Sequence, residues 1–170
     1  RNVVARAEIS PLLRRAVLAS EDDRFYLHRG FDLVEIDKAI DRKRAGGTLR
    51  GASTITQQVA KNIFLWEGRS FIRKGLEAYL TVWLELLLGK DRILDLYLNL
   101  AEWGDGVFGA EAAAQKHYGK SALKLTREEA ARLAAILPSP LRWSPDGSVA
   151  TSRAAIVLAR MQYAAPHTEP

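Results

Sequence analysis

SEDDRFYLHRGFD, from Ser20 to Asp32, is the stretch around which the rest of the chain is most easily understood. It places two arginines, a histidine and three aromatic residues beside its carboxylates, at the end of a predicted helix and in the following turn. Aromatic rings beside carboxylates indicate a partly dry cleft wall, where burial raises a carboxyl pKa toward values useful for general acid or base catalysis. The alternative is an ordinary helix C-terminus with a solvated acidic patch.

The segments on either side of this stretch are predicted to be helical. Ser10 followed by Pro11 indicates an N-cap and a first helical residue, and the apolar residues that follow form one face of a helix ending at Glu21. Asp32 with Glu35 predicts a second capped helix, which extends to residue 40. Residues 41–50 are basic, contain two glycines and lack apolar periodicity, which predicts a mobile loop. This loop is either an anion-attracting flap or a plain solvated loop.

A second dense stretch, GASTITQQVAKN, runs from Gly51 to Asn62. Thr54 and Gln57 fit a capping box, so a helix is expected to begin there. Residues four apart share a helical face, as do Gln57 with Lys61 and Gln58 with Asn62. Small hydroxyl residues at a helix N-terminus, followed by a lysine, suit a phosphate-facing surface. The alternative is a capped helix with an exposed polar face.

The segment from Phe71 to Leu88 predicts a helix that is apolar on almost every side. We therefore expect a buried central helix. Its polar residues form one stripe with a spacing of four: Arg73, Glu77, Thr81 and Glu85. Because an unpaired buried charge is costly, these side chains must be paired or line a cavity. Arg73 and Glu77 are either a structural ion pair or part of a cleft that also includes Lys74.

The remaining sequence predicts further helices and almost no strands. They are expected over residues 90–102, 110–118, 126–137 and 152–163, where Thr126 with Glu129 forms a capping box and Gly119 ends a helix. The fold class is therefore predicted to be all-α.

The composition excludes some classes of protein and leaves others open. The chain has 170 residues, of which 48% are hydrophobic and 26% charged, as in one folded domain with a core. A net charge of +5 suits nucleic acid, anionic lipid or a phosphorylated substrate, but no nucleic-acid-binding signature is present. The absence of cysteine excludes disulfides and thiolate metal sites. No membrane-spanning run occurs, and the start without Met suggests a lost N-terminal segment.

Four short motifs follow one another along the chain. They read Glu21-Asp22-x-x-Phe25-x-x-His28-x-Gly30, then Gly51-x-Ser53-Thr54-Ile55-Thr56-Gln57-Gln58, then Arg73-Lys74-x-x-Glu77, and last Lys90-x-x-Ile93-Leu94-x-x-Tyr97-x-Asn99. In this order the motifs resemble those of the glycosyltransferase family 51 peptidoglycan glycosyltransferases, over residues 9–161. The one departure noticed is Ala52, where many members have a second glycine, and alanine is small enough to be compatible with activity.

The resemblance implies a fold and a reaction. The fold would be a lysozyme-like helical domain over residues 1–170, with a small flexible jaw at about residues 31–50. The form would be the monofunctional one, without a transpeptidase domain. The reaction would polymerise lipid II into β-1,4 glycan strands with inversion, using the growing lipid-linked chain as donor and releasing undecaprenyl pyrophosphate.

The resemblance also implies roles for particular residues. Glu21 would be the general base that removes the proton from the acceptor hydroxyl, with Phe25, Tyr26 and Phe31 helping by partial desolvation. Glu77 would assist near the donor pyrophosphate or keep the cations in place. The cations expected to stabilise the leaving pyrophosphate are Lys61, Arg69, Arg73 and Lys74. The side chains that would bind sugar or phosphate oxygens are those of Ser53, Gln57, Gln58 and Asn62. His28 and Asn99 are expected to hold the motifs together.

Cofactor, partners and location follow from the same resemblance. Mg²⁺ or another divalent cation would assist at the pyrophosphate, although no metal-ligand cluster stands out in the sequence. Because the substrate is linked to a lipid, the enzyme would act at a membrane surface. The basic charge and the apolar residues from 33 to 49 suit contact with such a surface. The full-length protein would have one N-terminal transmembrane helix, absent from this chain, in the bacterial inner membrane. The catalytic domain would lie on the periplasmic side, where cell-wall synthesis proteins are further possible partners.

Two other functions remain open from the residues alone. A lysozyme-like peptidoglycan hydrolase would use two carboxylates, but it would have no need of cations directed at pyrophosphate. A basic helical binding module would account for the sequence pI of about 9.6, but not for Glu21 together with three polar motifs.

Overall fold

The computed structural model describes residues 3–47, 51–65 and 70–163, and over these residues the protein is helical. Its elements are η1 (Arg6–Glu8), α1 (Pro11–Glu21), η2 (Phe25–Leu27), α2 (Leu33–Arg44), α3 (Ile55–Phe64), α4 (Phe71–Leu87), α5 (Lys90–Leu100), α6 (Ala110–Tyr118), η3 (Ala122–Lys124), α7 (Arg127–Ile136) and α8 (Ser148–Met161). The described ranges contain no strand, only an isolated bridge between Glu102 and Phe108. The all-α prediction is confirmed.

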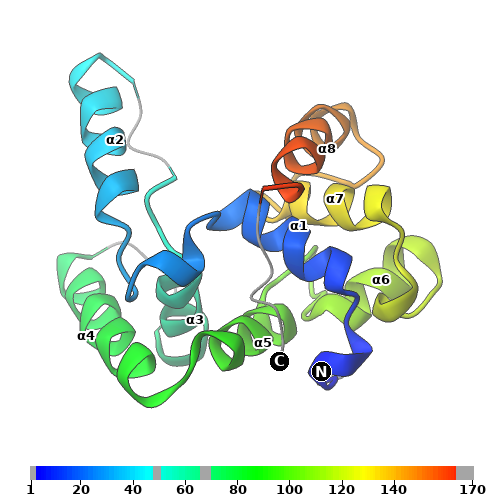
Figure 1. Cartoon of the computed structure of the whole chain (residues 1–170), viewed down its shortest axis with the longest axis horizontal. Coiled ribbons are helices and arrows are strands. Elements are labelled where there is room, and N and C mark those ends of the chain that lie inside the picture. Colours follow the sequence, from blue (N-terminus) through cyan, green and yellow to red (C-terminus); the bar gives the residue numbers. More distant parts are fainter. Residues whose placement is uncertain (1–2, 48–50, 66–69, 164–170) are drawn as a thin grey trace. The chain divides into compact units, whose positions relative to one another are not determined.

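The chain divides into two compact units, each described by itself. The first comprises residues 1–23 and 94–170, and the second comprises residues 24–93. Helices α1, α6, α7 and α8 belong to the first unit, and α2, α3 and α4 belong to the second (Figure 1). Helix α5 begins in the second unit and continues into the first. The predicted jaw over residues 31–50 lies within the second unit and stays a prediction.

The core of the first unit is built around α7. This helix packs against α1 and α8. Its buried residues are Ala130, Ala131, Leu133, Ala134, Ala135 and Ile136. Helix α1 contributes the buried residues Leu13, Ala16, Val17, Leu18 and Ala19. The buried alanines of α1 and α7 allow the two helix axes to approach closely.

Most helix ends lie where the local sequence predicted them. The two predicted capping boxes, Thr54 with Gln57 and Thr126 with Glu129, are both present. Gly119 ends α6 in the left-handed conformation, with φ of 63°. Two boundaries were wrong. Helix α2 continues to Arg44 because Arg and Lys are good helix formers and the first glycine comes only at Gly46. Helix α8 begins at Ser148 after a Gly147 cap, rather than near residue 152.

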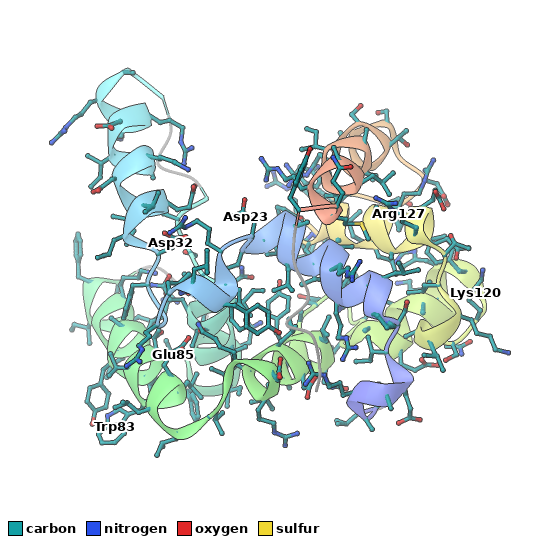
Figure 2. All side chains as sticks on the ribbon, in the orientation of Figure 1. Asp23, Asp32, Trp83, Glu85, Lys120 and Arg127 are labelled. Atoms are coloured by element: carbon teal, nitrogen blue, oxygen red, sulfur yellow. The ribbon has the colours of Figure 1, made fainter. Side chains whose placement is uncertain are left out.

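Helix α4 contradicts the prediction of a buried central helix. Its polar stripe is the buried side, since Glu77 is 4% exposed and Thr81 is 0% exposed. The large apolar residues that are exposed are Phe71, Ile72, Leu76, Tyr79, Val82, Trp83, Leu86 and Leu87. In Figure 2, Trp83 projects from the outer side of α4, whereas Glu85 belongs to the side that contacts α3. The apolar pattern of α4 therefore marks an exposed surface and not a buried one.

None of the described helices combines the length and the apolar character that a crossing of a lipid bilayer requires.

Candidate active site

Glu21, the predicted general base, is the last residue of α1. Ser10 caps the start of this helix, where its Oγ accepts a hydrogen bond from the Leu12 N–H at 3.2 Å, and Pro11 occupies the first helical position. At the other end Asp22 has a non-helical backbone, with φ of −163° and ψ of 75°, so the helix stops. Glu21 is half-buried at this end.

A pair of hydrogen-bonding contacts links Glu21 to α7. Ser20 Oγ lies 3.2 Å from Glu21 Oε1 and 3.0 Å from the carbonyl oxygen of Ala134. The link joins residues more than a hundred positions apart in the chain, so sequence reasoning missed it. The polar side chain beside Glu21 was the one available signal.

Tyr97 of α5 lies near the same carboxylates within the first unit. Its side chain is 2% exposed. Burial raises the pKa of the Tyr97 hydroxyl well above its ordinary value, and the negative charges of Glu21 and Asp22 raise it further. Tyr97 therefore stays protonated at neutral pH and contributes a neutral group, not a charge, beside the two carboxylates.

Asn99 makes local structural contacts, and its predicted role of holding the motifs together stays a prediction. Its Oδ1 accepts from the Val4 N–H at 2.9 Å, and its Nδ2 donates to the Val4 carbonyl at 3.2 Å. The same Nδ2 donates to the Asp95 carbonyl at 2.8 Å. Asn99 thus fixes the N-terminal segment to α5. In the second unit His28 packs edge-on against Phe25, with ring centroids 6.2 Å apart, in keeping with a packing role.

Gly30 joins the first and second motifs in the second unit and packs against α4. Its carbonyl accepts a hydrogen bond from Thr54 Oγ1 at 2.6 Å. Its φ of +83° is strained for other residues, and a Cβ there would lie 2.6 Å from Thr81 Cγ2 of α4. Glycine is therefore required for the turn and for close packing on α4.

The residues of α3 fall into two groups. Gln57 is 7% exposed, and its Oε1 accepts from the Thr54 N–H at 3.0 Å, so its side chain completes the start of the helix. Gln58 is half-buried, whereas Lys61 and Asn62 are exposed, as is Ser53 just before the helix. The exposed polar residues are available to a ligand, and Gln57 acts first as a capping residue.

Glu77 of α4 is a buried carboxylate held by two cations. Its Oε2 lies 3.6 Å from an Arg73 guanidinium nitrogen, and its Oε1 accepts a hydrogen bond from Lys74 Nζ. The side chain of Glu77 is 5% exposed, but that of Lys74 is 51% exposed, so the lysine faces solvent. A hollow of about 290 Å³ is lined by Ser70, Phe71, Arg73 and Lys74. Glu77 is thus an ion-pair partner, and its two cations border an open hollow.

A second paired carboxylate, Glu85, was not predicted as part of a site. Its Oε1 accepts from Thr56 Oγ1 at 2.5 Å and from Lys90 Nζ at 2.7 Å. Lys90 also lies over the ring of Phe25, 4.4 Å from the centroid. These contacts connect the first, second and fourth motifs through the end of α4. The spacing of four along the polar stripe of α4 was the signal that could have indicated this network.

The predicted site residues are distributed over both units. Glu21 belongs to the first unit. Those in the second unit and within the described residues are Ser53, Gln57, Gln58, Lys61, Asn62, Arg73, Lys74 and Glu77. Arg69 lies outside the described residues. The predicted roles of all these residues in substrate binding and catalysis stay predictions.

The expected divalent cation stays a prediction. Taken unit by unit, the described part of the chain does not bring together three His, Asp or Glu side chains. Asp32 in the second unit already accepts from the Val34 and Glu35 N–H groups and pairs with Arg24 at 3.0 Å. No chemical step is assigned to a metal ion.

Comparison with known proteins gives a consistent group of relatives. A family model described as Transglycosylase matches residues 1–162. Three curated relatives carry the name biosynthetic peptidoglycan transglycosylase. That from Pseudomonas putida is 59% identical over 136 residues, covering 80% of this chain and 58% of the relative. That from Caulobacter vibrioides is 56% identical over 136 residues, covering 80% and 59%. That from Shigella boydii is 56% identical over 162 residues, covering 93% and 66%. The chain thus spans less than two thirds of each relative.

Proposed function

The chain belongs to the transglycosylase family, and on that basis we propose that it is a peptidoglycan glycosyltransferase. It joins lipid II units into β-1,4-linked glycan strands for the bacterial cell wall. The growing lipid-linked strand is the donor, and the 4-hydroxyl of the lipid II N-acetylglucosamine is the acceptor. The anomeric centre inverts, and undecaprenyl pyrophosphate leaves.

The cations around Glu77 are the observation that carries this proposal. A leaving pyrophosphate gains negative charge as the glycosidic bond breaks, and fixed cations lower that barrier. Arg73 and Lys74 border the hollow, and Glu77 restrains both. Lys74 is half exposed, so its ammonium group remains accessible to an incoming phosphate. This arrangement suits the binding of a pyrophosphate leaving group and supports transfer from a lipid-linked donor.

The reaction also needs a base, and we assign that role to Glu21. Its carboxylate takes the proton of the acceptor 4-hydroxyl as the oxygen attacks the anomeric carbon. The new carbon–oxygen bond forms on the face opposite the pyrophosphate. The old bond breaks with its electron pair going to the pyrophosphate, which Arg73 and Lys74 stabilise. In this scheme Glu77 acts by holding the two cations.

The polar residues before and on α3 supply further substrate contacts in the proposal. Ser53, Lys61 and Asn62 are exposed and Gln58 is half-buried, so their side chains can bind sugar or phosphate oxygens. Gln57 contributes indirectly, through the capping box.

A lipid-linked substrate also implies a membrane surface as partner. The exposed apolar residues of α4, together with Leu33, Val34 and Ile40 of α2, support contact with lipid. The net charge of +5 adds attraction to anionic headgroups. The full-length protein is proposed to act at the outer side of the bacterial inner membrane, held by one transmembrane helix and in contact with other cell-wall synthesis proteins.

The test is polymerisation of labelled lipid II in detergent by the purified chain. Wild type is expected to form long glycan strands. Glu21→Gln is expected to form none, and Glu77→Gln to lose at least about a hundredfold in rate because its two cations are no longer restrained. Glu128→Gln is a matched control, because Glu128 is an exposed glutamate of α7.

Each other outcome has a definite meaning. Cleavage of preformed peptidoglycan, without strand formation, would replace transfer by the hydrolase function. Strand formation by Glu21→Gln would exclude Glu21 as the base.

A further inference from the structure

The carbonyl of Ala134 is an acceptor with spare capacity at the end of α7. In a continuing helix it would accept from the N–H four residues later, but that residue is Pro138, which has no N–H. The backbone donor that it does have is the Leu137 N–H, at a long 3.3 Å. Ser20 Oγ, at 3.0 Å, supplies a second donor from α1.

Ser20 is therefore placed between two acceptors. Its hydroxyl has one proton to donate and two lone pairs with which to accept. While Glu21 is ionised, the Ser20 proton can be directed to Glu21 Oε1, which lies 3.2 Å away. Once Glu21 is protonated, its own O–H can donate to Ser20 Oγ, and the Ser20 proton turns to the Ala134 carbonyl. Both protonation states of Glu21 thus have a partner at the same position.

We propose that Ser20 is a positioning residue that holds the general base Glu21 against α7 in both of its protonation states. The inference rests on the proposed function, because it takes Glu21 as the base. Ser20 acts through Glu21. It limits the rotamers of Glu21, and it stabilises the carboxylate by a charge-assisted hydrogen bond.

The surroundings of Glu21 in the first unit make such a donor useful. Asp22 adds a second negative charge directly beside it in sequence, and Tyr97 of α5 occupies a buried position near both carboxylates. A like charge and partial burial both disfavour an ionised carboxylate. A neutral donor fixed by the backbone of α7 opposes this by stabilising the carboxylate form of Glu21.

The experiment compares three variants in the lipid II polymerisation assay across pH. Ser20→Ala is expected to lower kcat about tenfold, as for loss of a hydrogen bond to a charged group, with KM changed less than about twofold. The acid limb of its rate profile moves to higher pH, since the carboxylate loses a donor. Ser20→Thr keeps the hydroxyl and is expected to restore both kcat and the acid limb.

Ser10→Ala is the matched control, because it removes a capping hydroxyl at the opposite end of the same helix. It is expected to lower thermal stability and leave kcat and the acid limb unchanged. Should Ser20→Ala not fold, Ser20→Cys, a weak donor of similar volume, carries the same expectation.

Three results from these variants would overturn the inference. One is a wild-type kcat and acid limb in Ser20→Ala. Another is the same loss of kcat in Ser10→Ala, which would make the role purely structural. The third is a Ser20→Thr variant as impaired as Ser20→Ala. Failure of the proposed function is separate: it appears as a wild-type chain that forms no strands from lipid II, whatever the variants at Ser20 do. Strand formation by Glu21→Gln would exclude Glu21 as the base and would overturn the inference with it.

Discussion

Helices α4 and α7 use the same helical periodicity in opposite ways. Both begin at a capping hydroxyl: Ser70 Oγ accepts from the Arg73 N–H, and Thr126 forms a capping box. Helix α7 then buries its apolar face, including Leu133, in the core of the first unit. Helix α4 buries its carboxylate and hydroxyl groups and exposes most of its large apolar residues, although Leu84 is buried.

The two helices are stabilised by different interactions. Apolar burial, worth about 25 cal/mol per Å², holds α7 in place. Helix α4 depends instead on polar groups that have found partners: Glu77 with Arg73 and Lys74, and Glu85 with Thr56. Polar pairing leaves most of the large apolar side chains of α4 exposed.

The largest expected effect is the loss of stability on truncating a buried apolar residue of α7, compared with an exposed one of α4. Leu133→Ala in α7 should lower the free energy of unfolding by about 2–5 kcal/mol, because it removes transfer free energy and leaves a cavity. Leu86→Ala on α4 is the matched change at a 69% exposed position and should cost less than about 0.5 kcal/mol. Urea unfolding measures both. Equal losses would mean that the apolar face of α4 is buried after all.

The next largest effect is expected at Gly30 of the first motif, where the backbone packs closely against Thr81 of α4. Gly30→Ala should cost about 2–4 kcal/mol, from a left-handed backbone and from the clash with Thr81. Gly51→Ala is a close control, because Gly51 has the same φ of +83° with nothing within 4 Å of its Cβ position. Chemical denaturation of both variants separates backbone strain from packing. If both lose the same stability, the contact with Thr81 contributes nothing.

A smaller effect is expected at the buried ion pair of α4. Glu85→Gln keeps the side-chain shape but removes the charge that faces Lys90, so the free energy of unfolding should fall by about 1–2 kcal/mol. Asp41→Asn interrupts the pair with Arg44, whose side chains are 75% and 77% exposed, and should change stability by less than about 0.5 kcal/mol. Thermal melts at low and high salt provide the measurement. A strong salt dependence in the Glu85 pair would contradict its burial.

The smallest effect is confined to alkaline pH and to the first unit. Burial raises the pKa of Tyr118 to about 12, with Asp146 and Glu129 adding to the shift and Arg132 opposing it. Because the folded pKa lies above the ordinary value of 10, the stabilisation is complete below pH 10 and is lost as pH rises toward 12. Tyr118→Phe should flatten this loss in unfolding experiments from pH 9 to 12, with little change at pH 7. An unchanged alkaline slope would contradict the assignment.

Local sequence signals predicted the helices well wherever a cap or breaker was present. Ser10 with Pro11 gave the start of α1, and Gly119 gave the end of α6. Prediction was wrong where the signal was indirect. The basic residues after residue 40 looked like a loop because they lack apolar periodicity, yet they continue α2. The exposed side of α4 was unpredictable because periodicity separates two faces without saying which one faces solvent.

The sequence predicted the local pairings in the candidate site but not its contacts between distant segments. The stripe from Arg73 to Glu77 predicted an ion pair or cleft, and the structure has the ion pair beside a hollow. The capping function of Gln57 also followed from its spacing to Thr54. The link from Ser20 to Ala134 could not be predicted, because it depends on how α1 packs against α7.

That link also ties together two positions that lie on separate helices. A residue with an N–H in place of Pro138 would compete with Ser20 for the Ala134 carbonyl. If position 20 were alanine, no hydroxyl would be present and this competition would not occur. In genetic terms the two positions form an epistatic pair. A substitution at 138 that is harmful in one background is neutral in the other, so drift at a helix end should be constrained by a serine 118 positions earlier in the chain.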